Sequence, residues 1–382
     1  MRMQSELRLR PVTRDKDMET TSSQHRESEA FVPARDQVSG ANVLLIRRRA
    51  DPTDDLYVSA PLQSLAACGR ISLAALDFGW GLRTAGQLRP HLRDCTHVIV
   101  SRYCPGAWVR ALIENCGRRF QLIYLLDDDI PAAPATHTLP LTYRLRMARV
   151  ARREFAGFLR GADRVVVTST YLAGKYRADN VALLEPANIW PVRSLDHFQD
   201  PETIVISFHA TAIHQADLAA IAPALREVHD RRAKVRLEIM TDGRVPLYLR
   251  RLPRCRVRRD MPWPEYKAFV QRAQSHIGLA PLMDSPYNRG KSHVKLFDIT
   301  AMGAAGVYSN RSPYAGVIAH GVNGILAGDD VDAWTAALIE LVDHPGRAKR
   351  MVESAQTRVA EIGDPERLVK YWRGVFGLGE KK

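Results

Sequence analysis

The sequence predicts an α/β protein made of two doubly wound, Rossmann-like domains that face each other across a cleft. Its 382 residues exceed the length at which a single hydrophobic core stops growing, so two domains are expected. Short apolar runs alternate with longer amphipathic stretches, and continuous apolar runs are typical of parallel strands covered on both faces. This alternation stops near residue 185 and starts again near residue 203.

The first set of strands is predicted in residues 41–195. Residues 1–40 before it are rich in Ser, Thr, Glu, Arg and Gln and show almost no apolar periodicity. Such a segment cannot bury enough apolar surface to offset the entropy cost of ordering, so we expect a disordered N-terminal tail. The predicted strands are 42–48, 71–77, 96–102, 120–126, 164–168 and 181–184.

The second set is predicted in residues 196–362, after a proline-containing linker. The last residues, 363–382, are expected to form a helix that returns towards the first domain. Ligands of open α/β sheets bind beyond the carboxyl ends of the strands, so the site is expected in the cleft between the domains. The predicted strands are 203–208, 235–240, 255–258, 276–280, 306–309 and 324–327, and the clearest helices are 212–231, 263–273, 331–342 and 345–361.

Composition narrows the class of protein. Apolar residues make up 46% and charged residues 25%, as in average globular proteins. The chain shows neither an apolar run long enough to span a bilayer nor a secretory signal, so a cytoplasmic protein with reduced cysteines is expected. A net charge of +13 calls for an anionic counterpart, either nucleic acid, anionic lipid or a phosphorylated small molecule. Because no nucleic-acid-binding fingerprint is found, nucleic acid is not the expected partner.

The most informative stretch is 278–326, where an apolar strand runs into a polar loop and then a helix. Gly290 and Ser292, a predicted helix cap, stand where backbone N–H groups at a helix start are unpaired, which together with the helix dipole makes an anion site. Lys291 and Lys295 are four residues apart, so they are expected on one face beside it. A diphosphate fits such a site.

Asp298 is predicted two turns into the same helix, on the side of Lys291. One carboxylate can accept hydrogen bonds from two adjacent ribose hydroxyls. The alternative is an ordinary loop and helix with surface lysines.

These motifs resemble a known family. The order strand, G-K-S, K-x-x-D/E, A-x-G, S-x-x-P-Y and G-x-N-G is similar to the donor half of the retaining GT-B glycosyltransferases of family 4 and its neighbours. The resemblance covers about 160 residues, and the motif residues that carry it run from Phe208 to Leu341. A weaker resemblance to the first domain of these enzymes lies in residues 56–69 and 161–169.

The resemblance implies roles for individual residues. Asp298 is similar to the second carboxylate of the E-x7-E signature, which holds the ribose, while the first carboxylate falls at Gly290 and is missing. Asp284 is a stand-in for the missing carboxylate. Lys291 and His209 are expected to act in catalysis on the phosphate side, together with Asp128 of the first domain. The further donor-binding residues expected are Thr211, Arg244, Asn288, Ser292 and Lys295.

Three carboxylates, Asp127, Asp128 and Asp129, follow the predicted strand 120–126. Adjacent carboxylates repel each other unless they are solvated, paired or near a cation. We expect Asp128 near the reacting sugar and Asp127 and Asp129 on the acceptor side; the alternative is an Asp-rich turn that caps the next segment. The D-x-D pattern permits a divalent metal, but GT-B enzymes usually need none, so neither a metal site nor a cofactor is expected.

Residues 143–160 form a basic helical pattern. Its predicted apolar side is Leu145, Ala148, Ala151, Phe155, Phe158 and Leu159. The arginines on the other faces suit an anionic membrane, where a polyprenyl-linked acceptor would sit. A solvated helix face is the alternative.

The sequence therefore favours an enzyme that transfers a sugar from a nucleoside-diphosphate-sugar to a glycan or lipid-linked acceptor, with the retention that the resemblance implies. Peripheral contact with the inner face of the membrane is expected. The alternatives are a sugar-nucleotide epimerase, a phosphorylase, a catalytically silent GT-B scaffold subunit and a nucleic-acid-binding protein.

Overall fold

The structure is a computed structural model that describes residues 40–79 and 83–379. The predicted disordered tail, residues 1–40, lies outside the described residues except for Gly40. All five cysteines are free thiols.

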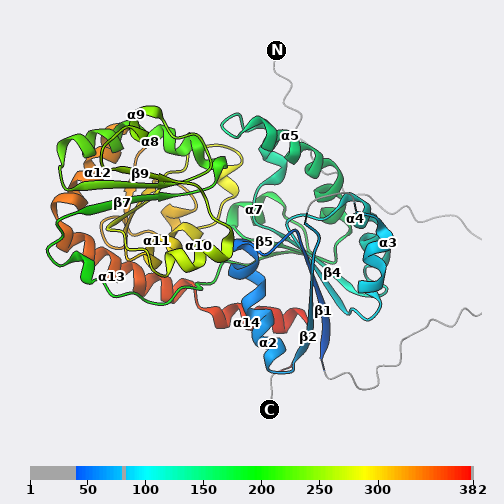
Figure 1. Ribbon diagram of the computed structural model, residues 1–382. Coiled ribbons are helices and arrows are strands. Elements are labelled where there is room, and N and C mark those ends of the chain that lie inside the picture. The colour runs from blue at the N-terminus through cyan, green and yellow to red at the C-terminus, as the bar shows by residue number, and fades with distance from the viewer. Residues whose placement is uncertain (1–39, 80–82, 380–382) are drawn as a thin grey trace, which may run out of the picture. The chain divides into compact units, whose positions relative to one another are not determined.

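Six parallel strands form the first sheet, in the order β2-β1-β3-β4-β5-β6 (Figure 1). Every residue of β3 (His97–Ser101) is buried, as expected of a strand covered on both faces. β2 (Ile71–Asp77), at the edge, is largely exposed or half-buried. The other strands are β1 (Ala41–Arg47), β4 (Gln121–Leu126), β5 (Arg164–Val167) and β6 (Val181–Leu183).

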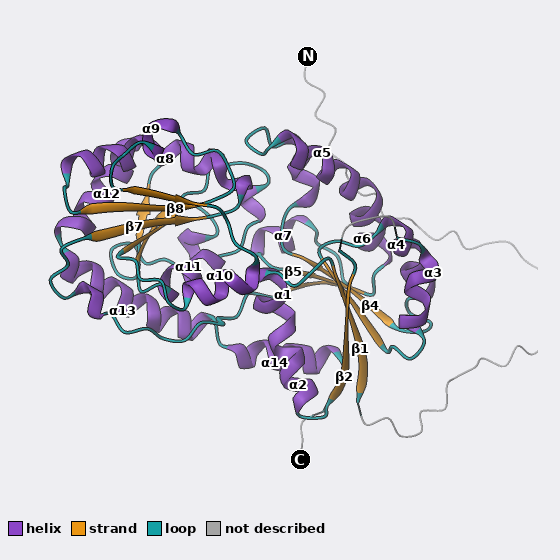
Figure 2. Ribbon diagram, viewed as in Figure 1, coloured by secondary structure: helices purple, strands orange, loops and turns teal. Residues whose placement is uncertain are grey.

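Helical segments connect the strands of this sheet (Figure 2). They are α1 (Pro52–Asp54), η1 (Asp55–Ser59), α2 (Ala60–Ala67), α3 (Ala85–Leu88), η2 (Arg89–Leu92), α4 (Gly106–Asn115), η3 (Ile130–Ala135), α5 (Leu141–Val150), η4 (Ala151–Phe155), α6 (Ala156–Gly161) and α7 (Thr170–Lys175).

The second sheet is also parallel and has the order β12-β11-β10-β7-β8-β9. Its strands are β7 (Ile204–His209), β8 (Val235–Met240), β9 (Cys255–Arg258), β10 (Ile277–Ala280), β11 (Ala305–Ser309) and β12 (Ile325–Ala327). Two doubly wound α/β sheets confirm the predicted fold class. The helical segments are η5 (Asp196–Phe198), η6 (Ala212–His214), α8 (Gln215–Arg231), α9 (Leu247–Arg250), α10 (Trp263–Val270), η7 (Asn288–Gly290), α11 (Val294–Ala301), η8 (Tyr314–Gly316), α12 (Val331–Asp343) and α13 (Pro345–Ile362).

Each sheet has one point where the strand order reverses. In the first sheet this point lies between β1 and β3, and in the second between β7 and β10. Ligands of open α/β sheets bind beyond the carboxyl ends of the strands at such a point. The residues that follow these four strands are therefore the first place to look for a site.

The last helix, α14 (Pro365–Val375), lies beside α2 of the first sheet (Figure 1). Trp372 is fully buried, and its indole Nε1 donates a hydrogen bond to the backbone oxygen of Tyr57 at 2.8 Å. The C-terminal helix therefore completes the core around the first sheet.

The basic segment is helical from Leu141 to Gly161, but its predicted apolar side is partly wrong. Leu145 is 64% exposed, whereas Met147 and Val150 are buried instead. The middle of the segment, η4, is a π-helix. A π-helical turn takes up more residues than an α-helical turn, so the residues before it face a different direction from the one that a continuous 3.6-residue period predicts.

Candidate functional site

The polar loop after β10, residues 281–293, contacts the Asp-rich segment after β4. Lys291 Nζ lies 2.7 Å from Oδ1 of Asp128, and the hydroxyl of Tyr287 donates to Oδ2 of Asp128 at 2.8 Å. Arg102 Nη2 lies 2.8 Å from the same Oδ2. Burial alone would raise the pKa of Asp128, but attraction to Lys291 and Arg102 outweighs burial and lowers it. Asp128 is therefore an ionised carboxylate held by two cations and a phenol.

The other two carboxylates of the Asp-rich segment are paired as well. Asp127 Oδ1 lies 2.8 Å from Nε of Arg102, yet burial raises the pKa of Asp127 to about 6. Asp129 is fully buried and accepts a hydrogen bond from the hydroxyl of Tyr176 at 2.6 Å, beside Lys175. These partners enclose Asp129, and its expected contact with an acceptor stays a prediction.

Gly290, at the position of the missing signature carboxylate, packs directly on Asp129. A Cβ atom built on Gly290 would lie 2.8 Å from Cβ and 2.9 Å from the backbone N of Asp129. Atoms at such distances clash, so no larger residue fits without a shift of the backbone. The hydroxyl of Ser169 also donates to the backbone oxygen of Gly290 at 2.9 Å.

The start of α11 differs from the prediction. The helix begins at Val294 with His293 as its N-cap, and no side chain of the described residues caps it. The predicted cap, Ser292, instead shares a hydrogen bond of 2.8 Å with the hydroxyl of Tyr57. Lys291 thus precedes the helix, and the argument that it shares a helical face with Lys295 does not hold. The first amide groups of α11 keep the partial positive charge that attracts anions.

Asp298 is the fifth residue of α11 rather than two turns into it, and it lies next to Lys295. Lys295 Nζ is 3.2 Å from Oδ2 of Asp298, and Asp298 is 8% exposed. The pKa of Tyr266 is raised well above its ordinary value, first by burial and then by Asp298, which places the phenol near this carboxylate. The pair of Lys295 and Asp298 is thus half-enclosed near the point where the second sheet reverses its order.

His209 ends β7, and its ring is buried. Burial, then the nearby Lys295 and Arg258, lower the pKa of His209 to about 3, so the ring is neutral at physiological pH. Its Nε2 atom is buried without a hydrogen-bond partner among the described residues. A buried polar atom without a hydrogen bond costs free energy, and the nearest carboxylate oxygen given for this nitrogen, of Glu238, lies 3.9 Å away.

Asp217, in the first turn of α8, braces the loop after β10. Oδ1 of Asp217 accepts from the backbone N of Met283 at 2.7 Å, and Oδ2 lies 2.8 Å from Nδ1 of His214. Asn288, predicted to bind the donor, is buried, and its amide donates to the backbone oxygen of Met283 at 2.9 Å. Asn288 therefore holds the loop, and it also lines a cavity, so its expected contact with the donor stays a prediction.

Asp284 is also engaged within this loop. Nε and Nη2 of Arg289 both lie 2.8 Å from its carboxylate oxygens, and the pair is exposed. The bidentate bond to Arg289, against little burial, lowers the pKa of Asp284. To take the role of the missing signature carboxylate, Asp284 would have to break its two hydrogen bonds with Arg289.

Thr211 and Arg244 are exposed near the end of β7 and after β8. The backbone N of Ala212, next to Thr211, donates to Oδ1 of Asp242 at 2.7 Å. The backbone N of Arg244 donates to Oε1 of Gln215 at 3.3 Å, and Arg244 itself is exposed. Both side chains flank the region of His209.

Sequence reasoning missed Arg102 and Tyr57. Arg102 follows β3 with a φ of 60°, in the left-handed region that residues with a side chain seldom adopt. Strained backbone of this kind is enriched at functional sites. Tyr57 lies in the stretch 56–69 and Arg102 ends the predicted strand 96–102, but the sequence predicts no role for either, because their contacts with Ser292 and Asp128 depend on the folded chain.

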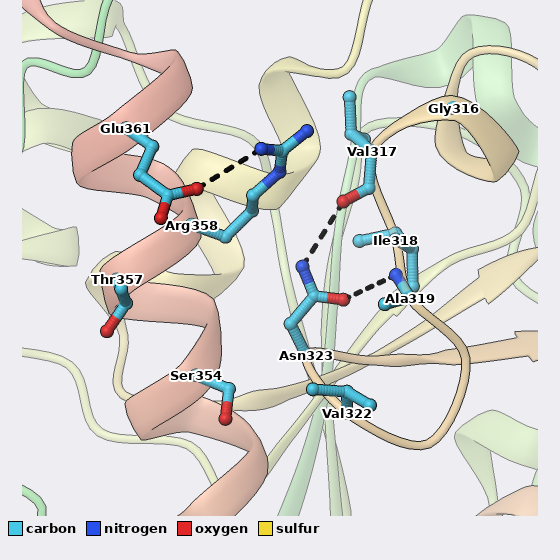
Figure 3. Close-up of a pocket in the computed structure, with 10 residues that line it drawn as sticks. All are labelled: Gly316, Val317, Ile318, Ala319, Val322, Asn323, Ser354, Thr357, Arg358 and Glu361. Atoms are coloured by element: carbon cyan, nitrogen blue, oxygen red, sulfur yellow. Dashed lines mark hydrogen bonds and ion pairs between the residues drawn. The ribbon is translucent and has the colours of Figure 1, made fainter.

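Two cavities near the second sheet have neither Lys291 nor Asp298 in their lining. One of about 250 Å³ is lined by Tyr171, Asp284, Arg289 and Arg311. Another of about 440 Å³ lies between the loop 316–323 and α13 (Figure 3). There Asn323 of the predicted G-x-N-G motif braces the loop, because its amide donates to the oxygen of Val317 and accepts from the backbone N of Ala319 (Figure 3).

Among the described residues, no group of three or more His, Cys, Asp or Glu side chains is arranged to hold a metal ion. Within the same part of the chain, no helix combines the length and apolar character needed to cross a bilayer. The site as described is built from cations, carboxylates and the start of a helix.

The fold is similar to that of solved glycosyltransferases. HepE of Anabaena, in complex with UDP-glucose, aligns with a TM-score of 0.61 and 12% identity over 88% of this chain and 99% of HepE. Sucrose-phosphate synthase of Thermosynechococcus elongatus aligns with a TM-score of 0.59 and 13% identity over 89% of this chain and 100% of that one. TarM, known from S. aureus, has a TM-score of 0.57 and 11% identity over 76% of this chain.

This chain spans 57% of the length of TarM but nearly all of HepE. Identities this low establish the fold alone: the chain has the GT-B fold of these glycosyltransferases. Its sequence matches no protein-family model and no curated protein sequence.

Proposed function

We propose that the protein transfers a sugar from a nucleoside-diphosphate-sugar to an acceptor. The observation that carries the proposal is the start of α11 near the β7–β10 reversal point. There an uncapped helix N-terminus, Lys291, Lys295 and the carboxylate of Asp298 occur within eight residues. Solved structures with this fold contain UDP or UDP-glucose, which supports a nucleotide-sugar as the ligand.

In this proposal the diphosphate binds at the first amides of α11. Lys295 and Lys291 add positive charge there, and Asp298 accepts hydrogen bonds from the ribose hydroxyls. The buried Nε2 of His209 donates to or accepts from the donor as a neutral ring, according to its tautomer. Thr211 and Arg244 extend the donor side of the site.

The chemistry needs stabilisation of a leaving diphosphate more than it needs a general acid. Negative charge grows on the diphosphate as the bond to the sugar breaks, and fixed cations and amide dipoles stabilise it. Asp128 positions Lys291 rather than attacking the sugar, because its carboxylate is held by Lys291, Arg102 and Tyr287. Retention at the anomeric carbon, without a protein nucleophile, is the course that the family resemblance implies.

We propose a polyprenyl-linked or glycan acceptor and peripheral contact with an anionic membrane. The observation in favour is an exposed face on α5, where Leu141 and Leu145, one turn apart, are 63% and 64% exposed. Glu154 is the single acidic residue between Leu141 and Gly161. Apolar and cationic side chains on one face suit an anionic lipid surface. The exposed arginines of this segment are Arg146, Arg149, Arg152, Arg153 and Arg160.

A second candidate is a donor-binding subunit without catalytic turnover. The packing of Gly290 on Asp129 favours it, since this contact excludes the first signature carboxylate. Such a protein would bind the same nucleotide-sugars but release no sugar with any acceptor. An epimerase would instead change the free donor without an acceptor.

The experiment is a thermal-shift screen of nucleotide-sugars, followed by a donor-turnover assay. A ligand at a hundred times its dissociation constant adds about 2.7 kcal/mol of stability, which is a measurable rise in Tm. We expect a shift with at least one nucleotide-sugar, reduced in Lys295→Gln but not in Lys349→Gln, an exposed lysine of α13. No shift with any nucleotide-sugar would contradict the proposal, while binding without turnover would favour the silent subunit.

A further inference from the structure

A cavity of about 170 Å³ lies in the first domain, beyond the carboxyl ends of β1 and β3. Arg48 follows β1, Tyr103 follows β3, and Arg146 and Glu154 reach the cavity from α5 and η4. These two strands are the ones between which the first sheet reverses its order. The cavity therefore occupies the position where open α/β sheets bind ligands. The donor site proposed above uses none of these residues.

Two guanidinium groups give the cavity its charge. Burial, and then repulsion from cations that include Arg146, lower the pKa of Arg48, although Tyr103 acts in the opposite direction. Arg48 also lies over the ring of Tyr103, with 5.9 Å between its guanidinium carbon and the ring centroid. Arg146 lies 5.0 Å from the ring centroid of Tyr143. Cations held near each other beside a cavity are stabilised when an anion binds between them.

Glu154 is the acidic residue of the lining. Burial raises its pKa to about 7, against a hydrogen bond from the backbone of Cys104 and attraction to Arg153. About half of this carboxyl is therefore neutral near pH 7, and a protonated carboxyl donates a hydrogen bond to an oxyanion. The lining as a whole carries net positive charge.

The cavity adjoins the cluster around Asp128. The guanidinium carbon of Arg102 lies 5.1 Å from the ring centroid of Tyr103, and Nη2 of Arg102 lies 2.8 Å from Asp128. Tyr103 thus has the cavity residue Arg48 and the site residue Arg102 on its ring. A molecule that fills the cavity would be connected to Lys291 through Tyr103, Arg102 and Asp128.

We propose that this cavity binds the phosphoryl group of the acceptor, held between Arg48 and Arg146. The inference rests on the proposed sugar transfer. A cavity of about 170 Å³ far exceeds the roughly 10–15 Å³ that one water needs, so it has room for a phosphoryl group. Guanidinium groups are the side chains best suited to bind phosphate through paired hydrogen bonds.

The test is calorimetric titration of the full chain with inorganic phosphate. We expect Arg146→Gln to weaken binding at least tenfold, while Arg149→Gln, an exposed arginine of the same helix outside the cavity, changes it less than twofold. Glu154→Gln should tighten binding severalfold, because it removes negative charge and keeps the shape of the side chain. Equal weakening by both arginine variants, or loss of binding in Lys291→Gln with none in Arg146→Gln, would overturn the proposal.

Farnesyl phosphate distinguishes the two sources of the phosphoryl group. Binding at least tenfold tighter than that of inorganic phosphate, and sensitive to Arg146→Gln, assigns the cavity to a lipid-linked phosphate. Equal affinity, with the same sensitivity, assigns it to a water-soluble phosphorylated acceptor. If neither farnesyl phosphate nor inorganic phosphate binds, the proposal is contradicted.

Titration with uridine diphosphate separates this inference from the proposed function. Arg146→Gln should leave the affinity for uridine diphosphate unchanged, because the donor site lies on the second domain. If no nucleotide or nucleotide-sugar binds the wild type while phosphate binding still depends on Arg146, the proposed function fails and the anion site stands. If nucleotides bind and phosphate binding ignores Arg146, the anion site fails alone.

Discussion

Lys291 and Asp128 form an ion pair of 2.7 Å that joins the loop after β10 to the segment after β4. The same carboxylate pairs with Arg102, so one buried anion forms ion pairs with two cations. A diphosphate that recruits Lys291 would share this ammonium with Asp128. In the proposed function, the pair would therefore link donor binding to the contact between the two sheets' loops.

Asp128→Asn should destabilise the protein by about 3–5 kcal/mol, because it leaves two cations near an uncharged amide in a largely buried place. Urea unfolding followed by tryptophan fluorescence measures the change. The matched control is Asp284→Asn, whose exposed pair with Arg289 is expected to contribute about 1 kcal/mol or less. Similar losses of unfolding free energy in both variants would show that the buried ion pairs of Asp128 contribute no more to stability than the exposed pair does.

Gly290→Ala should cost about 1–3 kcal/mol, since the new Cβ would lie 2.8–2.9 Å from atoms of Asp129. Gly174→Ala, in α7, is the control, because no atom lies within 4 Å of a Cβ built there. That variant should be neutral or more stable by up to about 1 kcal/mol, as expected of Ala in a helix. A Gly290→Ala protein as stable as Gly174→Ala would refute the close packing.

Asp54→Asn should change the pH dependence of stability. Asp54 is fully buried, and burial, then Asp51, raises its pKa to about 7. A raised folded-state pKa means that this carboxyl stabilises the fold below its ordinary pKa of 3.8, and that the contribution is lost as pH rises from there through about 7. The stability of Asp54→Asn relative to wild type should therefore rise between pH 5 and pH 8. Denaturant unfolding at several pH values tests this, and a constant difference would contradict it.

Asp298→Asn should weaken binding of uridine diphosphate about 10- to 100-fold, because charged hydrogen bonds to the ribose contribute about 1.5–3 kcal/mol. Binding of pyrophosphate, which has no ribose, should not fall. Asp332→Asn, exposed on α12, is the control for charge. An equal loss of affinity for uridine diphosphate and pyrophosphate would show that Asp298 acts on the phosphates or on the stability of the fold rather than on the ribose.

Replacing Leu141 and Leu145 with Ser should reduce sedimentation with vesicles that contain phosphatidylglycerol. Burial of each leucine side chain in the lipid interface would contribute about 1.5–3 kcal/mol to the free energy of membrane binding. Vesicles of phosphatidylcholine alone should bind the wild type weakly. The control pair is Val192→Ser and Leu247→Ser, which are 76% and 56% exposed elsewhere on the chain. An equal effect of the two pairs would exclude α5 as the membrane contact.

The fold was predictable because strands of a parallel sheet that is buried on both faces have continuous apolar sequences. The bounds of β2, β8 and β9 agree with the prediction at both ends. Where the prediction failed, a local irregularity was responsible. The π-helix η4 rotates Leu145 away from the apolar side, and α11 starts two residues after the expected cap.

The site was predictable in its segments but not in its pairings. The loop before α11 and the Asp-rich turn were both singled out, yet nothing in the sequence says that Lys291 pairs with Asp128. Such contacts join residues 163 positions apart, and they depend on how two domains meet. The sequence also does not show that Tyr57 contacts Ser292. The hydrogen bond between these two hydroxyls engages the serine that was predicted to cap the helix.

The position of α14 has a consequence for synthesis on the ribosome. The second sheet is formed by one uninterrupted stretch of chain, and it can close as soon as that stretch has emerged. The first sheet completes its core later, because the indole that packs beside Tyr57 belongs to Trp372, which is translated after both sheets. Of the two sheets, the one that is made first is thus completed last.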